Sequence, residues 1–91
     1  MKGDKAVLIH GANLTNTAML AHMFAEARRY FAEYSLPQPP LPSDVASYVG
    51  CELLITDTEG DRGERLGKVT LTDADGRVRY EQDWLIAGPR Y

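Results

Sequence analysis

The sequence predicts an α+β fold, in which one long amphipathic helix packs on a three- to four-stranded, mostly antiparallel sheet. Residues 14–35 hold the long segment that has a sustained helical period. Residues 50–87 contain short segments in which apolar and polar side chains alternate, as they do in half-buried antiparallel strands. A chain of 91 residues is expected to form a single domain around one core.

Residues 5–10, KAVLIH, form the first expected strand. Their run of consecutive apolar residues is typical of a strand that is buried within a sheet. The sequence leaves open whether this strand lies at the centre of the sheet or at its edge. Residues 11–13, Gly-Ala-Asn, interrupt the run before the helix begins.

The expected helix, residues 14–35, has an apolar stripe on one side and a polar row on another. Its interior is rich in alanine, methionine, leucine, glutamate and arginine, which favour helix formation. The stripe recurs at spacings of three and four residues, so it should cover the hydrophobic face of a sheet. The stripe consists of Leu20, Phe24, Ala27, Phe31 and Tyr34, and the polar row consists of His22, Glu26, Arg29 and Glu33.

Residues 36–43 are expected to end the helix and to lead the chain back to the sheet. They contain four prolines, which cannot continue a helix and which favour an extended polyproline II path. Their spacing matches the P-x-x-P pattern that SH3 domains bind. A stiff connector is the simpler interpretation, because short proline-rich connectors are common.

Residues 50–87 are expected to form a three-stranded antiparallel meander. Strands are predicted at 51–56, 66–72 and 77–87, and a polar turn at 57–65 joins the first two. An alternative is a small SH3-like β-barrel over residues 50–87, with the helix as an N-terminal appendage. The last strand alternates most clearly, with Val78, Tyr80, Trp84 and Ile86 as its expected inward residues.

Composition and charge limit the classes of function. The net charge is −3, with +1 on residues 1–43 and −4 on residues 44–91. An acidic domain without a basic run is a poor candidate for binding the phosphates of nucleic acid. Cys51 is the one cysteine, and no apolar run approaches the length of a membrane span. We therefore expect a cytoplasmic protein that does not bind membranes.

The residues that carry acid–base or metal chemistry form no recognisable motif, so we expect no catalytic set, no metal and no cofactor. His10, His22 and Cys51 are too far apart in the sequence for a short metal-binding motif. Residues 57–61 begin like a calcium loop, but Arg62 stands where that loop requires glycine. An enzyme that uses His10 as an acid or base is the weakest hypothesis that these residues suggest.

A second apolar strip on the helix gives the leading functional hypothesis. Met19, Met23 and Tyr30 are offset from the core stripe, and Arg29 lies beside them. Methionine side chains adapt to the surfaces of binding partners. We expect a small non-enzymatic interaction or regulatory protein, either a homodimer or one half of a hetero-complex, that uses this strip. The alternative is that the strip is core, covered by Val45, Tyr48 and Val49 or by the proline segment.

A second hypothesis comes from the order of the elements, which is a strand, a helix and then an antiparallel meander. This order is similar in outline to the small ribonuclease or gyrase-poisoning toxins of bacterial toxin–antitoxin pairs. The resemblance implies a protein that targets nucleic acid or gyrase through cationic and aromatic side chains on the sheet. Arg77, Arg79 and Tyr80 are the residues that would take this role.

Overall fold

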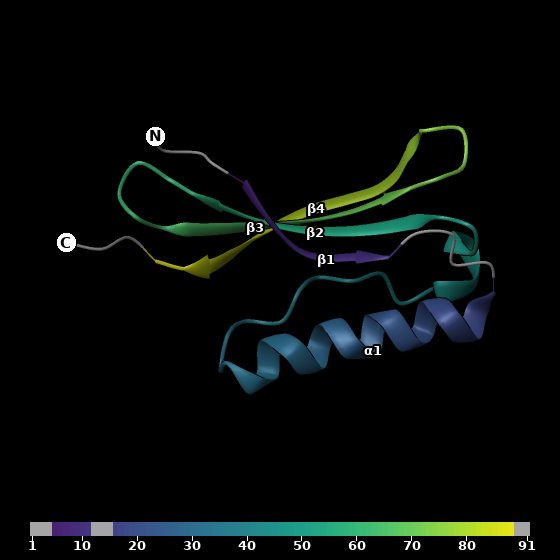
Figure 1. Ribbon diagram of the computed structural model, residues 1–91, viewed down its shortest axis with the longest axis horizontal. Coiled ribbons are helices and arrows are strands. Elements are labelled where there is room, and N and C mark those ends of the chain that lie inside the picture. Colours follow the sequence, from purple (N-terminus) through teal and green to yellow (C-terminus); the bar gives the residue numbers. More distant parts are fainter. Residues whose placement is uncertain (1–4, 12–15, 89–91) are drawn as a thin grey trace.

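The computed structural model describes residues 5–11 and 16–88, in which one long helix lies across one face of a four-stranded antiparallel sheet (Figure 1). The strands follow each other in the order β1-β2-β3-β4, which confirms the α+β class. The first and last strands lie at opposite edges of an open sheet, so the SH3-like barrel is wrong. The elements are β1 (Lys5–Gly11), α1 (Thr17–Glu33), the 3-10 helix η1 (Val45–Tyr48), β2 (Glu52–Glu59), β3 (Arg65–Thr72) and β4 (Val78–Ala87).

Both ends of α1 are closed by local hydrogen bonds. The Asn16 side chain accepts a hydrogen bond from the backbone N–H of Met19 at 2.9 Å, as expected of an N-cap. At the other end, Ser35 has a φ of 55°, and the Leu36 N–H donates to the Phe31 carbonyl at 2.9 Å. This is a Schellman arrangement with a serine in the left-handed position. It ends the helix two residues earlier than predicted; the predicted start at residue 14 lies outside the described residues.

The core lies between one face of α1 and one face of the sheet. Four of the five predicted stripe residues are fully buried, whereas Tyr34 is 63% exposed. Tyr34 is the C-cap residue, so the helix no longer holds its side chain against the sheet. On the sheet, alternate residues of β2 and β3 point toward α1. The buried hydrophobic cluster of the described residues is Leu20, Phe24, Ala27, Phe31, Cys51, Leu53, Ile55, Val69, Leu71 and Ile86.

β-Bulges shift the alternation in both edge strands. In β1, Val7 pairs with Thr56 and Ile9 pairs with Ile55, so Leu8 is an extra residue. Both Leu8 and Ile9 consequently pack against the core. A similar shift in β4, between its pairings with Leu71 and Thr72, leaves Val78 56% exposed. The prediction that Val78 points inward is therefore wrong.

The proline-rich connector packs beside β4, where it runs between the helix and the sheet (Figure 1). The indole N–H of Trp84 donates to the Pro37 carbonyl at 3.2 Å. The hydroxyl of Tyr80 donates to the Pro40 carbonyl, and Pro39 is buried. These contacts tie the connector to β4 along its length. In the described part of the chain, no helix is long and apolar enough to cross a membrane.

Gly67 is required because Trp84 lies directly over it. A Cβ atom at this position would come within 2.5 Å of the Trp84 Cζ3 atom and 2.8 Å of the Ile86 Cδ1 atom. We expect Gly67→Ala to lower the free energy of unfolding by about 1–3 kcal/mol, because the indole is held in place and cannot move aside freely. Urea denaturation measures this. Gly88→Ala is the matched control, since no atom lies within 4 Å of a Cβ there.

The raised pKa of the Tyr80 hydroxyl predicts how the stability of the fold changes in alkali. Burial, and secondly the neighbouring Tyr48, raises the pKa of Tyr80 above the usual 10.0. The folded chain then holds this proton more tightly than the unfolded chain, so the stabilisation is complete below pH 10.0 and is lost as the pH rises through the folded pKa. Tyr80→Phe should cost about 1 kcal/mol at neutral pH and give a shallower alkaline loss. Denaturation across pH tests this; an unchanged alkaline slope would contradict it. Tyr34→Phe is the control.

Candidate functional site

The interface between α1 and the sheet has one closed side and one open side. The connector fills the side next to β4 through the hydrogen bonds to Pro37 and Pro40. On the side next to β1, the surface is hollowed between the strand and the helix. We call this hollow, together with the pocket that continues it beyond the C-terminal end of α1, the β1-side groove.

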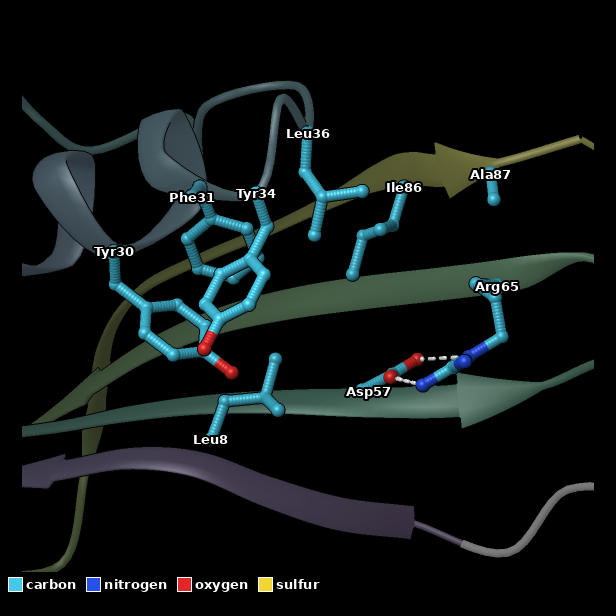
Figure 2. Close-up of a pocket in the computed structure, with 9 residues that line it drawn as sticks. All are labelled: Leu8, Tyr30, Phe31, Tyr34, Leu36, Asp57, Arg65, Ile86 and Ala87. Carbon is cyan, nitrogen blue, oxygen red and sulfur yellow. Dashed lines mark hydrogen bonds and ion pairs between the residues drawn. The ribbon is translucent and has the colours of Figure 1, made fainter.

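The pocket at the end of the groove has a volume of about 400 Å³. Figure 2 shows that the Tyr30 and Tyr34 side chains extend from α1 toward Leu8 of β1. Their rings contact each other, with centroids 5.1 Å apart. Because α1 ends here, all four strands contribute to the pocket. Its lining consists of Leu8, Tyr30, Phe31, Tyr34, Leu36, Asp57, Arg65, Ile86 and Ala87.

An ion pair forms the polar part of this pocket. Asp57 is only 5% exposed, and the Arg65 Nε–H donates to its Oδ1 atom at 2.9 Å. A second guanidinium nitrogen of Arg65 pairs with Oδ2, so the contact is bidentate, as Figure 2 shows. The side chain of Arg65 remains 41% exposed. The pocket therefore presents apolar walls beside one fixed guanidinium group.

Sequence reasoning missed this pair because it assigned residues 57–65 to a polar turn. In the structure β2 continues to Glu59 and β3 begins at Arg65, so the turn is shorter than predicted. The signal was present in the sequence. Leu53 and Ile55 alternate onto the core face, and the same period of two places Asp57 on that face.

The middle of the groove has a volume of about 360 Å³ and lies between β1 and α1. Leu8 and Tyr30 line both this part and the end pocket, so the two are continuous. The bulge in β1 contributes here, because it places both Leu8 and Ile9 on the helix side. The remaining lining residues come from α1 and are Met23, Glu26, Arg29, Tyr30 and Glu33.

Three of the four predicted interaction residues come together in this groove. Met23, Arg29 and Tyr30 line its middle, and Met19 lies beside it in a shallower hollow of about 330 Å³ that Met23 also lines. Met19 is 44% exposed and Tyr30 is 37% exposed. Arg29 donates to Glu26 Oε1 at 2.8 Å. Tyr48, one of the residues that would cover the strip if it were core, contacts Tyr80 on the β4 side.

The residues of the other two hypotheses lie away from this groove, Arg79 and Tyr80 in β4 and His10 in β1. His10 pairs with Glu52, with Nε2 and Oε2 3.0 Å apart, and lies opposite Leu54 on the sheet face that α1 does not cover. Arg77 closes a turn by donating its backbone N–H to Asp73, and the Tyr80 hydroxyl is bound to the connector.

Cys51 is buried in the core, and burial raises the pKa of its thiol. Within residues 5–11 and 16–88, no group of three or more His, Cys, Asp and Glu side chains is placed to hold a metal ion.

Comparison with known proteins gives no relative: no family model matches the chain, and neither the curated proteins nor the solved structures contain a significant match.

Breaking the ion pair tests its contribution to the pocket. Arg65→Ala should lower the free energy of unfolding by about 2–3 kcal/mol, because it leaves the Asp57 carboxylate buried without its partner. The loss is smaller than for a fully buried pair, since Arg65 is 41% exposed and water can enter in its place. Urea denaturation at pH 7 measures the effect.

Arg62→Ala is the matched control, because Arg62 is exposed in the turn and its removal should change stability by less than about 0.5 kcal/mol. Equal effects of the two variants would mean that the ion pair does not stabilise the fold.

Proposed function

We propose that this protein is a small interaction or regulatory module that binds another protein through the β1-side groove and the adjoining strip of α1. The observation that carries the proposal is the position of Met19, Met23 and Tyr30, which lie on the side of the helix that the connector leaves uncovered. The proposal assigns no catalytic role to any residue.

The composition of the groove supports protein binding. Methionine, tyrosine and arginine are enriched at the centres of protein–protein interfaces, and Met23, Tyr30 and Arg29 meet in this groove. Methionine is flexible enough to follow the surface of a partner. Tyrosine adds a large contact area together with a hydroxyl group that can bond to a polar rim.

The edges of the sheet support docking on the helix side rather than by strand addition. β1 carries a bulge at Leu8, and β4 carries register shifts near both of its ends. Bulges disturb the row of backbone groups that an added strand would pair with. The apolar surface beside α1 is therefore the better site for a partner than either edge.

The charged rim of the groove supports a specific orientation of the partner. Glu26, Arg29 and Glu33 line the groove on its helix side, so charges of both signs lie next to the apolar strip. Rim charges set the register of a complex and exclude partners of the wrong charge pattern, although each exposed pair adds little affinity.

Substituting the strip tests the proposal. Met19→Glu and Met23→Glu should each weaken binding at least tenfold, because each buries an unpaired carboxylate in the complex. Met19 is 44% exposed, so its variant should fold normally even if Met23→Glu is destabilised. The purified protein is immobilised, and the proteins that it retains from an extract of its native cells are identified. The affinity for each of them is then measured. The affinity of the immobilised protein for the same protein in solution is measured in the same way.

Val78→Glu is the matched control, because Val78 is an exposed apolar residue at 56% in β4, the strand farthest from β1 in the sheet. The proposal requires that wild type and Val78→Glu bind the same protein with equal affinity. A partner that both methionine variants also bind with unchanged affinity would show that the groove is not the binding site.

A further inference from the structure

We propose that the protein that occupies the β1-side groove is a second copy of this chain, with its α1 packed antiparallel to the first. This inference rests on the proposed function and names the partner. The inference rests on the order of charged and apolar residues along α1. Two copies of this helix complement each other when they run antiparallel, but not when they run parallel.

Four of the five His, Glu and Arg residues of α1 form a single solvent-facing row, and the fifth, Arg28, lies outside it. His22, Glu26, Arg29 and Glu33 are separated by four, three and four residues, so they follow one face of the helix. The side chains of His22, Glu26 and Arg29 are 71%, 37% and 67% exposed, and Glu33 is also exposed. The basic and acidic residues alternate along the row, and their spacing is symmetric about the point midway between residues 27 and 28.

This symmetry distinguishes the two ways in which two copies of α1 can pack. In an antiparallel pair centred on that point, Glu26 lies beside Arg29 of the second copy. His22 lies beside Glu33 of the second copy, where the imidazole can donate to the carboxylate. In a parallel pair each residue would face its own copy, so that glutamate would meet glutamate. Charge complementarity therefore selects the antiparallel arrangement.

The apolar strip has the same symmetry. Met23 and Tyr30, and likewise Met19 and Tyr34, are centred on the point midway between residues 26 and 27. The two centres differ by one residue, so an alignment centred on the charges leaves each methionine two residues, or about 3 Å, from its tyrosine along the helix axis, which flexible side chains can span. An antiparallel copy thus sets each methionine of the strip against a tyrosine, a contact that sulfur and aromatic rings favour.

The shape of the surface fits this exchange. The rings of Tyr30 and Tyr34, with centroids 5.1 Å apart, lie together toward the C-terminal end of α1. The hollow of about 330 Å³ that Met19 and Met23 line lies toward the other end of α1. A two-fold axis between them places the tyrosine end of each copy beside the methionine-lined hollow of the other.

The position of the strip in the fold determines where apolar and charged contacts lie between the two α1 helices. Met23 and Tyr30 line the groove next to β1, and the charged row lies on the solvent side of them. In a two-fold antiparallel pair, equivalent sides of the two helices meet. The result is an apolar seam along the groove with charge pairs outside it, as at the flanks of a coiled coil.

Charge reversal tests the arrangement without removing apolar surface. The variants are Glu26→Arg, Arg29→Glu and the double variant, and Asp75→Arg in the exposed β3–β4 turn is the matched control. Sedimentation and light scattering give the dissociation constant of the dimer, and circular dichroism checks the fold. Each single variant should raise the dissociation constant at least tenfold, because it places like charges side by side. The double variant should restore the wild-type value.

Mixing the two single variants gives the sharpest result. Glu26→Arg carries arginine at both positions and Arg29→Glu carries glutamate at both, so the mixture should form a heterodimer although each variant alone is monomeric. A dimer that the single variants leave intact, or that the double variant does not restore, overturns the antiparallel interface. A wild-type monomer at millimolar concentration overturns the second copy as partner. The proposed function then stands if the strip variants lose a different protein, and it fails if they bind that protein with unchanged affinity.

Discussion

Trp84 is the contact on which the rest of the structure depends, because helix, sheet and connector meet at this one side chain. Its ring covers Gly67 of β3, packs edge-on against Phe31 of α1 with centroids 5.5 Å apart, and donates its indole N–H to Pro37 of the connector at 3.2 Å. Because an indole ring supplies a large apolar contact surface, Trp84 anchors the C-terminal half of α1 on β4. It also fixes the path of the connector, so one side of the helix–sheet interface is filled. The groove on the opposite side is a consequence of this asymmetry.

Most of the fold could be predicted from the sequence, because hydrophobic period reports directly which face of an element is buried. The stripe from Leu20 to Phe31 and the alternation of Leu53 and Ile55 were enough to place a helix on an antiparallel sheet. The bulges could not be predicted, since an extra residue such as Leu8 leaves no mark on composition and shows only in the pairing with β2. The pair between Asp57 and Arg65 was missed for a different reason. Asp57 interrupts the apolar alternation of β2, so the sequence pattern gives no reason to place it in the core. Its burial depends on the ion pair with Arg65, eight residues later.

The candidate site was predictable in part. The offset of Met19, Met23 and Tyr30 from the core stripe follows from helical geometry alone, and the structure places all three beside the groove. Whether a strip of this kind is covered depends on where the next segment of the chain runs. Here that path is set by two hydrogen bonds from β4 to the connector, each of which joins residues about forty or more positions apart. Local sequence carries little information about contacts at such separations.

In the proposed complex, the placement of charge around the groove determines the specificity of binding more than the stability of the fold. A buried ion pair contributes little net stability compared with an apolar replacement of both partners, although removal of one partner alone is costly. Two apolar residues in place of Asp57 and Arg65 would therefore hold the sheet together about as well. Asp57 and Arg65 interrupt the apolar surface at the point where α1 ends, and the exposed row on α1 bounds the same surface along its length. An apolar groove without these limits would accept a partner in several registers with similar free energy. With them, the free energy of docking depends on register, because a shift of one helical turn places like charges together. In the proposed complex, the same residues that reduce the apolar area of the groove therefore give the partner a single preferred alignment.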